Sequence, residues 1–415
     1  MNWGFLFYTK LNNILSFVRG FLYFRYMQNF EVINPTRIVF GKDQLGRLPE
    51  LIHTISDKKR ILLAYGGGSI KSTGLLHKIL SYLTDFEVIQ FGGIEANPQF
   101  TTLMKGVQLA QQNEVDFILA VGGGSVIDGV KFMTGAYFYK GDSWDVLLRK
   151  DSCEFKKALP FGTILTIPAT GSEANSGAVI SREELKEKRT MGGPLFFPKF
   201  SFCDPTVVAT LPKRQIANGI VDAFMHTLEQ YLTFPSDNML QERQAEGILQ
   251  TLIEIGPEVM EQPSNYKLAS NLMWCATHAL NGNLRCGVIT DWTTHMIGHE
   301  LTAIYGIDHA RTLAIVAPRL YQNQFENKKE KLVQYGKRVW NLNGTTNEIA
   351  QAAIERTEAF FQSLGIQTKI ADYSADTDHI AAIIKSRFIE RGWLAMGERQ
   401  AITPQDVEEI VINSI

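Results

Sequence analysis

Residues Phe117–Asp128 read FILAVGGGSVID, an apolar run that stops at three glycines and a serine before a helical pattern continues to Ala136. An unbroken apolar run of this length predicts a strand buried on both faces of a parallel sheet. A glycine-rich junction between such a strand and a helix is typical of a βαβ unit. We therefore expect this stretch to lie in an α/β domain.

The same pattern extends to both sides of this stretch. From Asn34 to about Pro212, short β-branched runs alternate with helical ones. Further strands are expected at 61–65, 87–91 and 163–167, with helices at 71–83 and ending near 113. After Pro212 the strand-like runs stop, and apolar residues recur every three or four positions. The prediction is an α/β domain with a Rossmann-like parallel sheet over 27–211, followed by an all-α domain over 212–415.

Two junctions of the first domain carry glycines followed by a serine, Gly66-Gly67-Gly68-Ser69 and Gly122-Gly123-Gly124-Ser125. Glycines let the backbone approach a pyrophosphate closely, and the N-terminus of the following helix favours an anion. The alternative for each junction is a tight turn that needs a positive φ. Because there are two such junctions, we prefer a nucleotide site, although the usual GxGxxG pattern is absent.

The helical half places five side chains of the types that bind metals in three short segments. Asp222 and His226 are four residues apart, His295 and His299 repeat this spacing, and His309 follows. On a helix, a spacing of four places both side chains on one face. A carboxylate with several imidazoles suits a divalent ion such as iron or zinc, and an incomplete protein ligand set leaves a position for substrate. The alternative is that each histidine is an ordinary core or surface residue.

The composition of the chain excludes several classes of partner. Its 415 residues carry 41 Lys and Arg against 43 Asp and Glu, so no net field favours nucleic acid or an anionic membrane. The expected partner is a small molecule. The four cysteines form no CxxC pair, which indicates a reducing compartment, and we expect a cytoplasmic protein.

The segment 1–26 differs from the rest of the chain. It is aromatic and basic, it has no acidic residue, and Lys10 and Arg19 interrupt its apolar runs before they reach the length of a membrane span. An interfacial helix, a weak signal peptide and a targeting segment are open alternatives. Our preferred interpretation is that Met27 is the native start and that 1–26 is an extension that is not native.

These motifs together resemble the iron-containing, or group III, alcohol dehydrogenases from Met27 to the C-terminus. The segments that carry the resemblance are 36–41, 97–98, 122–128, 169–173, 204–205, 222–226 and 295–309. The first glycine junction and the segment Asp291–Met296 are most similar to the branch of NADPH-dependent aldehyde reductases and butanol dehydrogenases. The resemblance implies a homodimer and the fold that these enzymes share with dehydroquinate synthase.

The resemblance also implies roles for individual residues. The metal ligands would be Asp222, His226, His295 and His309, and the pyrophosphate loop would be Gly123, Gly124, Ser125 and Asp128. Further nucleotide contacts would come from Gly66, Gly67, Gly68, Ser69, Asn97, Thr166, Thr170 and Lys188. Relatives that use NAD have an aspartate at the position of Gly67, and its absence here implies a preference for NADP(H) over NAD(H).

The implied activity is hydride transfer between NADP(H) and short-chain primary alcohols or aldehydes, of the butanol and butanal type, assisted by one iron or zinc ion. His299, one turn after His295, is either a proton relay or a residue that orients His295. Trp292, Met296 and Ile297 are expected to form an apolar wall for the substrate. Alternatives are a polyol or glycerol dehydrogenase, a metal-dependent lyase of the dehydroquinate synthase type, and a non-catalytic binding protein.

Overall fold

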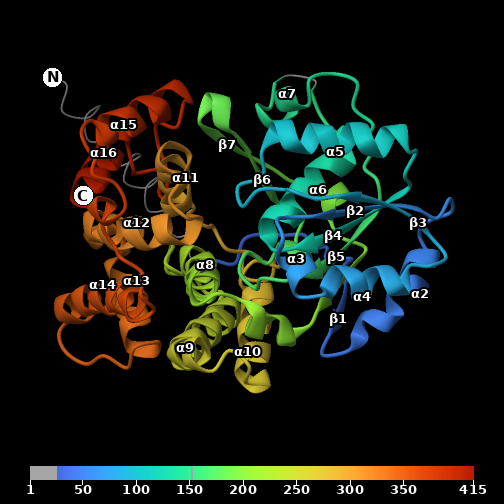
Figure 1. Ribbon diagram of the computed structural model, residues 1–415. Coiled ribbons are helices and arrows are strands. Elements are labelled where there is room, and N and C mark those ends of the chain that lie inside the picture. The colour runs from blue at the N-terminus through green and yellow to red at the C-terminus, as the bar shows by residue number, and fades with distance from the viewer. Residues whose placement is uncertain (1–25, 151–152) are drawn as a thin grey trace.

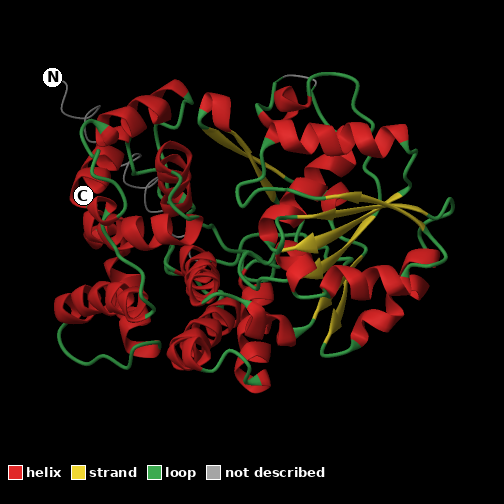
Figure 2. Ribbon diagram, in the orientation of Figure 1, coloured by secondary structure: helices red, strands yellow, loops and turns green. Residues whose placement is uncertain are grey.

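A parallel sheet forms one side of the molecule and a group of helices forms the other (Figure 1, Figure 2). The computed structural model describes residues 26–150 and 153–415, so nearly all of the segment 1–26 lies outside the described residues. The strands of the sheet are β1 (Arg37–Phe40), β2 (Arg60–Tyr65), β3 (Glu87–Phe91), β4 (Phe117–Gly122), β5 (Phe161–Leu165) and β8 (Phe200–Cys203), in the order β1-β8-β5-β4-β2-β3. A separate antiparallel pair consists of β6 (Ala178–Arg182) and β7 (Glu187–Met191).

Helices cover both faces of the sheet (Figure 1). They are α2 (Leu48–His53), α3 (Ser69–Ser72) and α4 (Leu75–Tyr82) on one face, and α5 (Phe100–Gln112), α6 (Gly124–Ala136) and α7 (Ser143–Leu147) on the other. Successive side chains of a strand point to opposite faces. Leu62 therefore packs with α5 and α6, whereas Ile61 and Leu63 pack with α2 and α4. The prediction of a doubly covered parallel sheet is confirmed.

The chain crosses the sheet in a way that brings the two glycine junctions together. It runs from β2 outward to β3 and then returns to β4, on the other side of β2. β2 and β4 are thus parallel neighbours, and Tyr65 at the end of β2 pairs with Val121 of β4. Ligands of open α/β sheets bind at such a reversal of strand order, outside the carboxyl ends of the strands.

The second half of the chain is helical, as predicted (Figure 2). Its helices are α8 (Lys213–Tyr231), α9 (Met239–Glu261), α10 (Tyr266–Ala279), α11 (Thr293–Tyr305), α12 (His309–Asn323), α13 (Phe325–Arg338), α14 (Thr346–Ser363), α15 (Ile380–Glu390) and α16 (Pro404–Asn413). α8 packs against α9, α10 and α12, and nearly all of its residues from Ile216 onward are buried. Within residues 26–150 and 153–415, none of the helices has the length and apolar character that crossing a membrane requires.

Some expected elements differ from the observed ones. The helix expected at 71–83 is wrong: α3 and α4 are separate helices, because the chain turns at Gly74, whose φ is +77°. The strand expected at 163–167 begins and ends two residues earlier, as β5. The sequence did not predict the short strands β1 and β8 or the β6–β7 pair.

Gly219 provides a test of how closely α8 approaches the loop that follows β5. A Cβ atom on Gly219 would lie 2.3 Å from the carbonyl oxygen of Pro168, which belongs to the backbone and cannot rotate away. We expect Gly219→Ala to lower the free energy of unfolding by about 1–3 kcal/mol, because one helix must shift. Urea denaturation followed by circular dichroism measures this change.

The matched control is Gly247→Ala, also inside a helix. Gly247 is exposed on α9, and no atom lies within 4 Å of the added Cβ. Replacing glycine by alanine at such a position stabilises a helix by about 0.5–1 kcal/mol. If Gly219→Ala and Gly247→Ala changed the free energy of unfolding in the same direction, the close approach at Gly219 would be contradicted.

Candidate functional site

A cleft of about 1390 Å³ lies between the sheet and the helical half. One side is formed by the ends of β2 and β4, and the other by α8, α11 and the start of α12. Of the nucleotide and metal residues predicted from the sequence, Gly68 alone does not line this cleft. The predicted nucleotide and metal residues, which lie far apart in the sequence, therefore share one cavity.

Three predicted metal ligands converge on one point of the cleft. Asp222 of α8, His295 of α11 and His309 of α12 each offer a ligand atom, and these atoms lie within 4.8 Å of one another. His226 is adjacent but outside this group: its Nδ1 is 3.7 Å from Asp222 Oδ1, and its ring stacks on His295 at 4.7 Å between centroids. The ring of His299 lies 4.9 Å from that of His309.

Burial controls the protonation of this group. It raises the pKa of the Asp222 carboxyl, and it lowers the pKa of His226 to about 4 and of His295 to about 3. Burial, followed by the positive charge of Lys188, holds the pKa of His309 well below its usual range. The imidazoles are therefore neutral near pH 7, and neutral imidazole is the form that binds a metal.

The unpaired atoms of the group fit a divalent cation. Buried atoms of the group without a hydrogen-bond partner among the described residues include Asp222 Oδ1, His226 Nδ1 and His295 Nε2. The His309 nitrogen that faces Asp222 Oδ1 is Nε2, at 3.8 Å. Buried polar atoms are normally paired, because an unpaired one loses its hydration without compensation. One carboxylate and neutral imidazoles at this spacing suit iron or zinc. The chemistry of the donor set therefore agrees with the predicted metal.

Glu229, which the sequence analysis missed, contacts one of these histidines. It lies on α8, one turn after His226, and its Oε2 contacts His295 Nδ1. Burial, and after it the charge of Asp291, raise the pKa of Glu229, and hydrogen bonds from Thr294 and His295 oppose this. The sequence did contain a signal for Glu229. It follows Asp222 and His226 at a spacing that places all three side chains on one face of a helix.

The glycines of the two junctions allow close packing, and none of them has a positive φ. A Cβ atom on Gly124 would lie 2.3 Å from Thr170 Oγ1, and one on Gly123 would lie 3.1 Å from Ile167. By contrast, a Cβ atom on Gly67 would have no neighbour within 4 Å. The turn that needs a positive φ is thus the wrong interpretation, and Gly67 borders open space.

Two polar residues of the second junction are bonded to the protein. Ser125 donates a hydrogen bond through Oγ to the carbonyl oxygen of Ala96. Asp128 is partly buried, and its carboxylate accepts hydrogen bonds from Ser172 Oγ at 2.6 Å and from Val179 N at 2.9 Å. Asp128 therefore fixes the segment 172–179 beside the glycine loop.

Lys131, also missed by the sequence analysis, holds the same segment. It is fully buried on α6, and its Nζ donates hydrogen bonds to Ser172 Oγ at 2.7 Å, Asn175 Oδ1 at 2.9 Å and Gly177 O at 2.7 Å. Burial lowers the pKa of Lys131 to about 8, so it remains charged near pH 7. A lysine inside an otherwise apolar helical run was the sequence feature that could have indicated it.

The remaining nucleotide candidates lie between the two junctions and the metal ligands. Lys188 of β7 donates a hydrogen bond through Nζ to Asn97 Oδ1 at 3.1 Å. Thr166 and Thr170 lie on the loop that follows β5, and both line the cleft. Burial lowers the pKa of Lys188 to about 8, while neighbouring carboxylates, Asp128 first, raise it.

The apolar wall expected for the substrate is partly wrong. Trp292 and Met296 line the cleft, and the indole of Trp292 packs edge-on against His295, with centroids 5.3 Å apart. Ile297 does not contribute: its side chain is fully buried in the helical core. Successive residues of a helix are rotated by about 100°, so Met296 and Ile297 face different directions.

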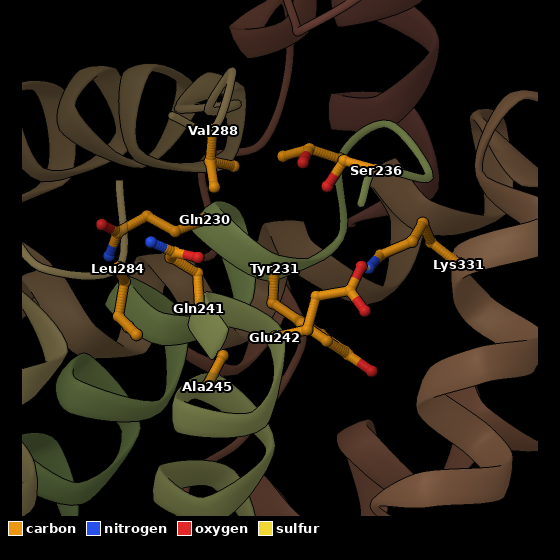
Figure 3. Close-up of a pocket in the computed structure, with 10 residues that line it drawn as sticks. Gln230, Tyr231, Ser236, Gln241, Glu242, Ala245, Leu284, Val288 and Lys331 are labelled. Carbon is orange, nitrogen blue, oxygen red and sulfur yellow. Dashed lines mark hydrogen bonds and ion pairs between the residues drawn. The ribbon is translucent and has the colours of Figure 1, made fainter. Parts of the chain in front are cut away.

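A second cavity, shown in Figure 3, lies behind Gln230. It holds only about 10 Å³, about the space of one water molecule. Glu242 and Lys331 face one another at its edge and form an ion pair at 2.7 Å. This cavity is too small for a substrate, and the large cleft is the candidate site.

Comparisons with known proteins agree with this geometry. Two family models match the chain: iron-containing alcohol dehydrogenase over residues 35–205, and Fe-containing alcohol dehydrogenase family, C-terminal, over residues 216–415. The chain is 48% identical over 380 residues to the NADPH-dependent aldehyde reductase YqhD of Escherichia coli, which covers 91% of this chain and 97% of that protein. It is 39% identical over 394 residues to the probable NADH-dependent butanol dehydrogenase 1 of Bacillus subtilis, covering 94% and 100% of the two chains.

Solved structures show the same fold. The structure of YqhD from Escherichia coli matches with a TM-score of 0.91 at 46% identity, over 94% of this chain and 99% of that chain. The NADH-dependent butanol dehydrogenase A of Thermotoga maritima matches with a TM-score of 0.88 at 32% identity, over 93% and 98%.

Proposed function

Since the chain belongs to the iron-containing alcohol dehydrogenase family, we propose that it transfers a hydride between NADP(H) and short-chain primary alcohols or aldehydes, using one divalent metal ion. The observation that supports this most strongly is the shared cleft. It places the glycine junctions of a nucleotide site and an unpaired carboxylate and imidazole group in one cavity.

Four side chains would hold the metal: Asp222, His226, His295 and His309. A metal bound there supplies a Lewis acid for the aldehyde oxygen, and NADPH supplies the hydride. Burial of Asp222 and His295 lowers the local polarity, which would strengthen the electrostatic interactions that stabilise developing negative charge. Trp292 and Met296 would cover the carbon chain of the substrate with an apolar surface.

The nucleotide would lie along the carboxyl ends of β2 and β4. The N-terminus of α6, at Gly123, Gly124 and Ser125, would bind the pyrophosphate, and Gly66, Gly67 and Ser69 would border the adenosine ribose, whereas Gly68 does not line the cleft. Asp128 would act indirectly, because both of its oxygens already accept hydrogen bonds from the segment 172–179. Asn97, Thr166, Thr170 and Lys188 would contact the rest of the cofactor.

His299 would carry the proton in this reaction. Its ring is next to that of His309, and burial, together with Lys188, lowers its pKa well below the usual value. A neutral imidazole can accept a proton from an alcohol and pass it toward solvent. In aldehyde reduction the proton moves in the opposite direction, through the same ring.

We further propose a cytoplasmic homodimer. The cysteines Cys153, Cys203, Cys275 and Cys286 are all unpaired in the structure, which agrees with a reducing compartment. The segment 26–33 exposes several large apolar side chains, namely Tyr26, Met27, Phe30, Val32 and Ile33. Exposed apolar groups of this size often belong to an interface between subunits.

The metal-dependent activity is tested on protein purified without oxygen. Elemental analysis should find about one iron or zinc ion per chain, and a chelator should abolish NADPH oxidation with butanal, because the aldehyde oxygen loses its Lewis acid. Glycerol oxidation is measured in parallel, to separate a polyol dehydrogenase. Chelated, metal-free protein that still reduces butanal would contradict the role of the metal. Metal-bound protein that is inert to all aldehydes would favour the lyase.

The preference for NADP(H) is tested with Gly67→Asp. The Cβ atom of the new side chain has no protein atom within 4 Å, so the fold is expected to be unchanged. Its carboxylate would repel the 2′-phosphate, and juxtaposed like charges cost several kcal/mol, so kcat/KM with NADPH should fall more than about tenfold while that with NADH is retained or rises. Gly67→Asn, of equal size without the charge, is the control. A wild-type enzyme with equal efficiency for both cofactors would refute the preference.

The role of His299 is tested with His299→Ala. If His299 relays the proton, the variant should keep its metal and lose about 10²–10⁴-fold in turnover, with an altered pH profile. His278→Ala, which changes a histidine outside the cleft, serves as control. If His299 instead orients a ligand, metal content should fall as well. Normal turnover with an unchanged pH profile would exclude the relay.

A further inference from the structure

The carboxylate of Glu229 connects the two helices that carry most of the candidate metal ligands. Its side chain is 2% exposed, and it reaches from α8 to the first turn of α11. Oε1 accepts a hydrogen bond from the backbone N–H of Thr294 at 2.8 Å and a longer one from that of His295 at 3.4 Å. Oε2 contacts Nδ1 of the His295 ring. Both oxygens of Glu229 therefore contact the start of α11.

This contact determines which nitrogen of His295 is free. A carboxylate oxygen accepts hydrogen bonds, so the ring proton of neutral His295 lies on Nδ1. The lone pair is then on Nε2, which is buried and has no partner among the described residues. The ligand atom of His295 lies within 4.8 Å of those of Asp222 and His309. Glu229 thus favours the tautomer that binds a metal.

The same carboxylate also fixes the start of α11. The first N–H groups of a helix have no partner within the helix, and the side chain of its N-cap residue, Trp292, makes no capping bond. Glu229 satisfies two of these N–H groups from another helix. Because Asp222 and Glu229 belong to one helix, the Glu229 side chain helps to fix the position of His295 relative to Asp222, together with the hydrogen bond from Asp291 N to Glu229 O at 3.1 Å.

We propose that Glu229 is a positioning residue that sets the metal affinity of the site through the orientation and tautomer of His295. This inference rests on the proposed function, which supplies the metal. Carboxylates that hold a metal-binding histidine in this way contribute about 10–100-fold to metal affinity.

Glutamine at this position cannot replace the carboxylate. If the amide NH₂ of Glu229→Gln faces His295, Nδ1 must accept, and the ring proton moves to Nε2, the atom that faces the metal. If the amide is rotated so that its oxygen faces His295, its NH₂ group faces the backbone N–H of Thr294. Two donors then face one another, and the start of α11 loses its acceptor. Either arrangement weakens the binding of metal, although the size of the side chain is unchanged.

The experiment measures the affinity of the metal-free protein for Zn²⁺, by competition with a chromophoric chelator. We expect Glu229→Gln to bind Zn²⁺ about 10–100-fold more weakly than wild type. The control is Glu242→Gln, which neutralises a buried carboxylate that pairs with Lys331 and Gln334 far from the ligands and should leave the affinity unchanged. If Glu229→Gln does not fold, Glu229→Asp keeps the charge but shortens the reach, and it should lose affinity as well.

A second comparison separates positioning from general stability. In a His295→Ala background, Glu229→Gln should cause no further loss of Zn²⁺ affinity, because the residue through which Glu229 acts is gone. An equal loss in both backgrounds, or full affinity in Glu229→Gln, would overturn the inference while leaving the proposed function intact. Weaker Zn²⁺ binding by Glu229→Gln, in a protein whose wild type fails to reduce aldehydes, would support the inference and overturn the proposed function.

Discussion

The burial of unpaired metal-type ligands is the constraint on which the rest of the structure depends. Asp222 lies on a helix that is enclosed on all sides, and Asp222 Oδ1 has no hydrogen-bond partner among the described residues. Leaving a buried carboxylate without full compensation is costly, and burial raises the pKa of Asp222. A divalent cation removes this cost. The architecture of α8, α11 and α12 is therefore best explained as a support for a bound metal.

The α/β half and the helical half are joined through the segment 172–179 by polar contacts as well as by packing. The segment 172–179 is held on one side by Lys131 and Asp128, from the helix that follows the second glycine junction. On the other side, Glu173 accepts a hydrogen bond from Thr277 of α10 at 2.6 Å. The segment 172–179 thus links α6, beside the nucleotide site, to the helical half that carries the metal ligands. Hydride transfer requires that the cofactor and the metal-held substrate be fixed relative to one another.

Short-range periodicity in the sequence correctly predicts the elements whose residues all face the same kind of environment. An unbroken apolar run indicates a strand covered on both faces, and β4 is such a strand. The wrong predictions follow from the same reliance on local pattern. The apolar residues around Gly74 suggest one helix, but the positive φ of this glycine divides it in two. Ile297 matched the apolar character of a substrate wall, yet it faces the core, because apolar character alone does not specify direction.

The sequence by itself determined the class of fold, the two glycine junctions and the set of metal-type side chains, because these depend on residue type and on spacings within one strand or helix. Only the tertiary structure decided that β2 and β4 are neighbours and that the ligand atoms of Asp222, His295 and His309 converge. It also revealed the roles of Glu229 and Lys131, whose partners are at least 41 residues away. The physical reason is that packing against elements distant in the sequence sets the rotation of each helix about its axis. The spacing of residues within one helix does not determine this rotation.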